Sequence, residues 1–228
     1  MLLWRVLLAA AVSLPAGWFA LVLIDRAPGD QPLLRPLRGL ARTRREILVQ
    51  GLVSVLCVLM ALRFDAVPVA MMIGMLALVT VLVALTFIDI ADYRLPDRIV
   101  LPMLCGSIVW VSVVSIATGD PAEIRGALCG AVVFFAVLFI AHLISPRGMG
   151  FGDVKLAALM GLFLGWTAES VIDAVVLVLW AMLIGFAIGT VAGIVILARR
   201  RSNQPFPFGP FLAAGTVLAL LASSAIVG

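Results

Sequence analysis

Long apolar segments separated by short charged stretches run along the whole chain. Segments of about 17–25 apolar residues are long enough to cross a bilayer as α-helices. Lipid offers no hydrogen-bond partner to the backbone, so such segments satisfy their N–H and C=O groups internally, as a helix does. The pattern therefore predicts an all-α, polytopic membrane protein with about eight spans. They are expected near residues 2–24, 47–62, 66–88, 99–118, 124–144, 154–166, 170–198 and 206–225.

The organisation between these segments predicts one membrane domain over residues 1–228. No long polar insertion, low-complexity tract or internal repeat interrupts the apolar pattern. The largest loop, residues 25–46, contains three prolines and an arginine cluster, which favours an irregular basic segment at the membrane surface. Function is therefore expected to lie in the spans and the short loops.

Composition excludes an ordinary soluble fold and charge predicts the orientation. Hydrophobic residues make up 64% of the chain and charged residues 12%, against roughly 45–50% and about 25% in soluble domains. With the N-terminus outside, only Arg5, Arg63 and Arg125 face outward, as the positive-inside rule requires. The +4 net charge then reflects topology and contact with anionic lipid, and no nucleic-acid partner is expected. The cytoplasmic cations would be Arg26, Arg35, Arg38, Arg42, Arg44, Arg45, Arg94, Arg98, Arg147, Lys155, Arg199, Arg200 and Arg201.

Cysteine and histidine usage gives no sign of a metal site. Cys57, Cys105 and Cys129 lie within apolar segments and form no Cys-x-x-Cys pair. The single histidine, His142, also lies within a span and is interpreted as a polar packing residue. Because the usual ligand spacings are missing, we expect neither a metal nor a cofactor.

Acidic residues close to hydrocarbon are costly and so are functional candidates by default. Asp89 directly follows the apolar run that ends at Ile88, and this position makes it the first candidate. Asp92 lies three residues further on and is the reserve candidate. Asp97 follows a proline and precedes an apolar run, a pattern typical of a helix N-cap. The other acids outside the glycine-rich segment described next are explained by loop solvation or helix-end charge.

A glycine-rich segment precedes the sixth expected span and supplies the second candidate. Gly148, Gly150 and Gly152 alternate with apolar residues and lead directly to Asp153. Glycines allow positive φ values and close approach by neighbouring chain. Two interpretations stay open for Asp153 from this motif alone: a cap on the following helix, or a catalytic carboxylate.

Two carboxylates make a peptidase when they share one proton around a water molecule. The ionised group takes a proton from the water, and the protonated group polarises the scissile carbonyl. Close placement separates their apparent pKa values. This chemistry needs neither a metal nor a covalent intermediate, which suits a sequence without zinc-ligand spacing or a nucleophile–histidine arrangement.

Four motifs in a fixed order resemble the type IV prepilin leader peptidases. They are Phe87-Ile88-Asp89, then Leu95-Pro96-Asp97, then the segment from Gly148 to Lys155, and finally Pro207-Phe208-Gly209-Pro210. The resemblance covers roughly residues 66–215. Its second half contains the Gly-x-Gly-Asp signature also found in presenilin-like intramembrane proteases.

The resemblance implies a membrane aspartic peptidase with Asp89 and Asp153 as its catalytic pair. Gly150, Gly152 and Lys155 would support the active-site loop. The enzyme would remove the basic leader of prepilin or pseudopilin precursors at the cytoplasmic face of a bacterial inner membrane. Longer members carry two Cys-x-x-Cys pairs in the first cytoplasmic loop and also methylate the new amino terminus. This chain has no cysteine in that loop, which puts methyltransferase activity in doubt.

Two other functions use the same acids. A presenilin-like protease would apply the two-aspartate chemistry inside transmembrane segments. A proton-coupled transporter would use the acids to carry protons, but transporters place such acids at mid-membrane between paired repeats. Here the candidate acids lie at one predicted surface and no repeat is visible.

Overall fold

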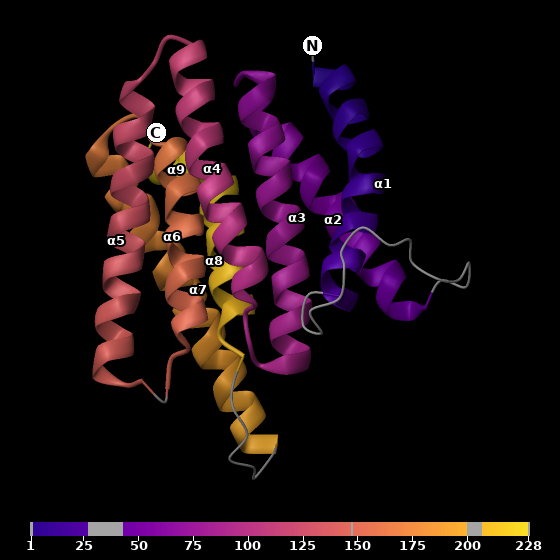
Figure 1. Ribbon diagram of the computed structural model, residues 1–228, viewed down its shortest axis with the longest axis vertical. Coiled ribbons are helices and arrows are strands. Elements are labelled where there is room, and N and C mark those ends of the chain that lie inside the picture. The colour runs from indigo at the N-terminus through magenta and orange to yellow at the C-terminus, as the bar shows by residue number, and fades with distance from the viewer. Residues whose placement is uncertain (1, 27–42, 147, 200–206, 228) are drawn as a thin grey trace. The chain divides into compact units, whose positions relative to one another are not determined.

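A computed structural model describes residues 2–26, 43–146, 148–199 and 207–227, and these residues are helical with short connections (Figure 1). The all-α prediction is confirmed, and each of the first seven expected spans corresponds to one helix, whereas the eighth, 206–225, covers α8 and part of α9. The predicted basic loop, residues 25–46, lies mostly outside the described residues. The helices are α1 (Leu2–Arg26), α2 (Arg44–Arg63), α3 (Val69–Asp92), α4 (Asp97–Ala117), α5 (Ala122–Ile144), α6 (Phe151–Trp166), α7 (Val171–Arg199), α8 (Gly209–Leu221) and α9 (Ser223–Val227).

Six of the described helices are long and apolar enough to cross a membrane: α1 to α5 and α7. Helix α8 is apolar but shorter, and α6 has 16 residues. The chain is therefore a polytopic helical membrane protein. The count of eight spans and the outward N-terminus stay predictions.

Two compact units can be distinguished along the chain, Met1–Ile88 and Asp89–Gly228. The boundary falls within α3, so that its last turn, starting at Asp89, belongs to the second unit. The single-domain organisation expected from the sequence stays a prediction.

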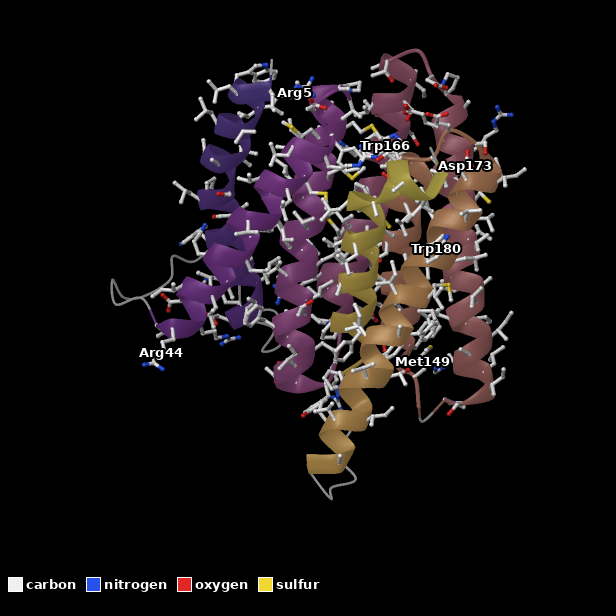
Figure 2. The ribbon with its side chains drawn as sticks, turned by 180° about the vertical axis from the view of Figure 1, so that it is seen from behind. Arg5, Arg44, Met149, Trp166, Asp173 and Trp180 are labelled. Carbon is white, nitrogen blue, oxygen red and sulfur yellow. The ribbon has the colours of Figure 1, made fainter. Side chains whose placement is uncertain are left out.

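In the first unit, polar side chains join α1 to α2. The Gln50 side chain donates a hydrogen bond to the Ser13 carbonyl at 2.9 Å, and the Ser13 and Ser54 hydroxyls lie 3.0 Å apart. Gln50 fits there because Gly17 has no side chain: a Cβ at Gly17 would meet the Gln50 amide. Arg5 is buried and donates to the Phe64 and Val67 carbonyls at 3.2 and 2.7 Å. Figure 2 shows Arg5 and Arg44 at opposite ends of this unit.

Helix α6 is the central helix of the second unit. All its residues from Asp153 to Trp166 are buried except Lys155, and it packs against α4, α5, α7 and α8. Two glycine pairs set its distance from α5, since Gly126 faces Gly165 and Gly130 faces Gly161. A Cβ at Gly126 would lie 2.6 Å from the Gly165 carbonyl oxygen, so the backbones touch directly.

Helices α7 and α8 are joined in the same way. A Cβ at Gly215 would meet the backbone of Ala181 and Gly185, and one at Gly185 would lie 2.9 Å from the Phe211 carbonyl oxygen. The N-terminal ends of α4, α6 and α8 lie toward the same end of the unit (Figure 1). Figure 2 shows Met149, just before α6, at the end opposite to Trp166 and Asp173. Close glycine packing therefore holds α6 against α5 and α8 against α7, and the first residues of α6 and α8 lie at the same end of the unit.

The opposite end is held by a buried hydrogen-bond cluster. The Ser115 hydroxyl donates to the Glu123 carboxylate at 2.8 Å, and the Trp166 indole N–H lies 2.9 Å from Ser115 Oγ and 3.1 Å from Glu123 Oε2. The three residues come from α4, α5 and α6 respectively. Glu123 therefore has a packing role in addition to its place in the first turn of α5.

Candidate active site

The first candidate carboxylate, Asp89, lies near the C-terminal end of α3 and is 5% exposed. The helix ends soon afterwards because Tyr93 adopts a left-handed conformation with φ of 53°. The Tyr93 N–H still donates to the Asp89 carbonyl at 2.9 Å. The reserve candidate, Asp92, is exposed. Of the two acids, only Asp89 is buried.

The second candidate, Asp153, is the third residue of α6 and is 8% exposed. The N-cap of α6 is Gly150, so the interpretation of Asp153 as the capping residue is wrong. Its backbone N–H donates to the Gly150 carbonyl at 3.1 Å. Its buried Oδ1 atom accepts no hydrogen bond from any residue that the structure describes. Asp153 thus places a free carboxylate oxygen inside the protein.

The two carboxylates meet at Gly209, the first residue of α8. The Gly209 N–H donates a hydrogen bond to Asp89 Oδ2 at 3.1 Å. A Cβ at Gly209 would lie 2.8 Å from Asp89 Oδ2 and 3.4 Å from Asp153 Oδ1. Both oxygens therefore border one point beside the Gly209 backbone. The fold brings together two acids that are far apart in sequence, as the catalytic prediction requires.

Burial changes the acidity of Asp153, which lies in the first turn of α6 and outside the six candidate spans. Loss of hydration raises its pKa from 3.8 to about 7, because burial penalises the charged form. The charge of Asp89 adds to the rise, and a hydrogen bond from the Gly150 backbone to the Asp153 carboxylate opposes it. The pair therefore retains a proton up to neutral pH.

Lys155 lies two residues after Asp153 in sequence but pairs with another acid, Asp97. Its ammonium group donates to both carboxylate oxygens of Asp97 at 2.7 Å and lies 5.0 Å from the centre of the Phe151 ring. The prediction of Asp97 as a helix N-cap is wrong, since Pro96 is the N-cap of α4 and Asp97 is its first helical residue. The ion pair joins the starts of α4 and α6, and the supporting role of Lys155 in the active-site loop stays a prediction.

The glycines before Asp153 are close-approach positions. Neither Gly150 nor Gly152 has a positive φ, a conformation that Gly119 alone adopts among the described glycines. A Cβ at Gly152 would lie 2.9 Å from the Cβ of Leu95, in the α3–α4 connection. One at Gly150 would lie 3.3 Å from Asp153 Oδ2. The expectation of close approach is confirmed, and that of positive φ is wrong.

Three residues of this region were missed as site residues. Gly209 belongs to a motif noted in the sequence, but nothing in that motif indicates contact with the acids. Leu95 packs on Gly152. His142 of α5 has Nδ1 2.8 Å from the Met149 carbonyl oxygen and its ring 5.5 Å from that of Phe151, so it holds the loop before α6. This contact fits the interpretation of His142 as a packing residue.

Candidate metal ligands do not gather among the residues that the structure describes: no group of three or more His, Cys, Asp or Glu side chains occurs there. The expectation that the protein works without a metal or cofactor stays a prediction.

Comparison with known proteins identifies the family. Residues 76–194, which include both candidate aspartates, match the type IV leader peptidase family. The prepilin leader peptidase/N-methyltransferase of Aeromonas salmonicida (strain A449) is 34% identical over 183 residues, covering 79% of this chain and 59% of that relative. The protein of the same name from Aeromonas hydrophila is 36% identical over 148 residues, covering 64% and 48%.

The corresponding Pseudomonas aeruginosa protein is 34% identical over 155 residues, covering 65% of this chain and 49% of the relative. The chain thus spans between 48% and 59% of the length of these three relatives. No solved structure matches it. The family model covers both acids and the glycine-rich segment that suggested the resemblance, and the chain therefore belongs to the type IV leader peptidase family.

Proposed function

We propose that the chain is a membrane aspartic endopeptidase that removes the leader peptide from type IV prepilin-like precursors. Asp89 and Asp153 are its catalytic pair. The observation that carries the proposal is the meeting of two buried carboxylates at Gly209, one of them with a pKa of about 7. Such a pair holds one base and one acid at the same pH.

The reaction follows from one shared proton. The ionised carboxylate takes a proton from a water molecule as the water oxygen bonds to the scissile carbonyl carbon, and the protonated carboxyl gives its proton to the carbonyl oxygen. The tetrahedral intermediate then collapses. Its C–N bond breaks, the amine receives the proton held by the first carboxylate, and the second regains its own. The pair ends as it began.

The proposed location is the cytoplasmic face of the bacterial inner membrane. Arg94 and Arg98 lie in the α3–α4 connection and the first turn of α4, at the end of the unit where α6 begins. The positive-inside rule places such cations on the cytoplasmic side. A site at that surface would bind the short leader that precedes the membrane-spanning segment of the precursor. Lipid would surround the apolar helices of the peptidase.

Methylation of the product is a separate matter. The relatives are named as both peptidase and N-methyltransferase, and this chain spans 59% and 48% of the length of the two Aeromonas proteins. It has three cysteines and no Cys-x-x-Cys pair. We propose that it acts as the peptidase alone and leaves a free amino terminus.

Co-expression with pilin-like proteins of the source genome tests the function. Mass spectrometry of the purified pilins is expected to show loss of the leader and an unmethylated new amino terminus. A matched culture carrying the Asp153→Asn variant serves as the control. Cleavage inside the apolar segment would indicate a presenilin-like protease. Uncleaved pilins in both cultures would contradict the peptidase, and a proton flux would then favour the transporter.

Cleavage is expected to fall as the pH rises above about 7. Because the pKa of Asp153 is raised, its proton persists to neutral pH. Activity is therefore present below about pH 7 and declines above it, by about tenfold per pH unit. The measurement is kcat/KM for a synthetic precursor peptide in detergent between about pH 5 and 9, the range that brackets a pair of shifted carboxyl groups. Circular dichroism at each pH checks that the helices persist. A rate that stays level through the alkaline range would contradict a required proton on Asp153.

Chelation is expected to leave cleavage unchanged. The carboxylate pair supplies both the base and the acid, so no metal-bound water is needed. The rate for the same peptide would be compared before and after dialysis against EDTA. Loss of activity that zinc restores, but magnesium does not, would contradict the two-aspartate mechanism.

A further inference from the structure

The two carboxylates differ in the hydrogen bonds that they accept. Asp89 Oδ2 accepts the backbone N–H of Gly209 at 3.1 Å. The Asp153 carboxylate has a backbone hydrogen bond with Gly150, but its buried Oδ1, which borders the same glycine, accepts none from the described part of the chain. A hydrogen bond donated to a carboxylate favours its ionised form. The two acids therefore have unequal surroundings although both are buried.

The N–H of Gly209 is the backbone donor at the start of α8 that is available to Asp89. Pro210, the next residue, has no N–H. The N–H groups of Phe211 and Leu212 both donate to the Phe208 carbonyl, at 3.1 and 3.3 Å. The N-cap residue, Phe208, supplies no side-chain hydrogen bond. Asp89 therefore receives the first N–H of a 13-residue helix, where the helix dipole also favours negative charge.

Glycine is required at this point for space. A Cβ at residue 209 would lie 2.8 Å from Asp89 Oδ2, which is closer than real Cβ contacts. The same Cβ would lie 3.4 Å from Asp153 Oδ1, an ordinary contact. A side chain at residue 209 would therefore displace Asp89 before Asp153 and lengthen the hydrogen bond between the residue 209 N–H and Asp89 Oδ2.

We propose that Gly209 is a positioning residue that assigns the roles within the pair. It holds Asp89 as the ionised base that takes the proton from water, and it leaves the proton on Asp153, the acid that donates to the carbonyl oxygen. This assignment rests on the proposed peptidase function and deepens it, because family membership does not distinguish the two acids. The family match ends at residue 194, before Gly209.

Other charges at this end do not reverse the assignment. The described charged and titratable groups at this end are Asp153 and Lys155 of α6, Asp97 and Arg98 of α4, Arg94 of the α3–α4 connection, His142 of α5, and Asp92 on the same helix as Asp89. Lys155 and Asp97 neutralise each other in their ion pair, and Asp92 is exposed. Burial and the charge of Asp89 raise the pKa of Asp153 to about 7, in agreement with Asp153 as the proton carrier.

The test compares the pH dependence of kcat/KM for wild type, Gly209→Ala and Gly106→Ala. Gly106 is the matched control because a Cβ there meets nothing within 4 Å. Gly106→Ala should behave as wild type. Gly209→Ala should have its acidic limb moved up by about one pH unit, so that it loses up to about tenfold at the acidic end of the profile, and its alkaline limb should be unchanged, as expected for one weakened hydrogen bond to a charged group.

A uniform loss with both limbs in place would overturn the assignment and leave Gly209 a structural residue. An uncleaved peptide with wild-type enzyme would instead count against the proposed function. The two failures are therefore distinguishable.

A second measurement works even when Gly209→Ala does not fold. Infrared difference spectra at mildly acidic pH report the C=O stretch of protonated carboxyl groups. The signal of the pair should persist in Asp89→Asn and disappear in Asp153→Asn. Disappearance in Asp89→Asn with persistence in Asp153→Asn would reverse the roles and overturn the proposal. This readout needs no substrate and so does not depend on the peptidase activity.

Discussion

Asp89→Asn and Asp153→Asn are each expected to abolish cleavage while the protein still inserts and folds. An amide can supply neither the carboxylate that takes a proton nor the carboxyl that gives one, so the loss should be on the order of a thousandfold or more. Cleavage of a precursor peptide by purified protein in detergent measures it. Asp92→Asn is the control, because Asp92 is an exposed acid one turn beyond Asp89. An active Asp89→Asn protein beside an inactive Asp92→Asn protein would place the first aspartate one turn later.

The Asp153 variant should also be the more heat-stable protein at pH 8. In the folded state the pKa of Asp153 is about 7, against 3.8 ordinarily, so the unfolded chain loses this proton first. The contribution of protonated Asp153 to the free energy of unfolding is fully present below about pH 4 and is lost as the pH rises through about 7. Asparagine cannot ionise and so avoids this loss, which amounts to roughly a few kcal/mol. Thermal unfolding of both proteins at pH 5 and pH 8 checks the sign.

Gly152→Ala is expected to reduce cleavage on the order of a hundredfold at near-normal protein abundance. The added Cβ would lie 2.9 Å from the Cβ of Leu95, so either the Leu95 connection or the first turn of α6 must shift. Asp153 follows directly, and a displacement of about 1 Å in a catalytic group can cost a hundredfold in rate. The measurement is peptide turnover by purified protein matched for thermal stability.

The comparison with Gly150→Ala sharpens this prediction. There the new Cβ would lie 3.3 Å from Asp153 Oδ2, a tight contact that a small rotation of the carboxylate relieves. We therefore expect a smaller loss than for Gly152→Ala. Gly51→Ala, in open space on α2, is the neutral control. Full turnover by Gly152→Ala would show that this glycine is only a connector.

The helices were predictable because each apolar segment carries its own signal. The expected span 2–24 became Leu2–Arg26, and 99–118 became Asp97–Ala117, since length and hydropathy depend on neighbouring residues only. Asp89 and Asp153 could be selected as candidates for a related reason: each is an acid at the edge of such a segment, and family motifs surround both. These signals are local in sequence.

The contacts of the site were not predictable because they join segments far apart in sequence. Asp97 has a proline before it and an apolar run after it, as an N-cap often does, but Lys155 lies 58 residues away and pairs with it instead. Gly209 lies 120 residues from Asp89, and a single sequence does not encode that distance in any local pattern. A glycine between phenylalanine and proline is compatible with many turns, and only the fold shows that it faces two carboxylates.

The close packing of α7 against α8 through their glycines has a consequence for when the candidate site is complete. Both aspartates are synthesised before α8, since they lie in α3 and α6, but the N–H that contacts Asp89 belongs to residue 209. That residue reaches Asp89 only once α8 has packed on α7 through Gly185 and Gly215. A nascent chain that has inserted α1 to α7 thus contains both acids but lacks the backbone donor beside them. The two acids and their backbone donor would therefore come together only after α8 has been inserted.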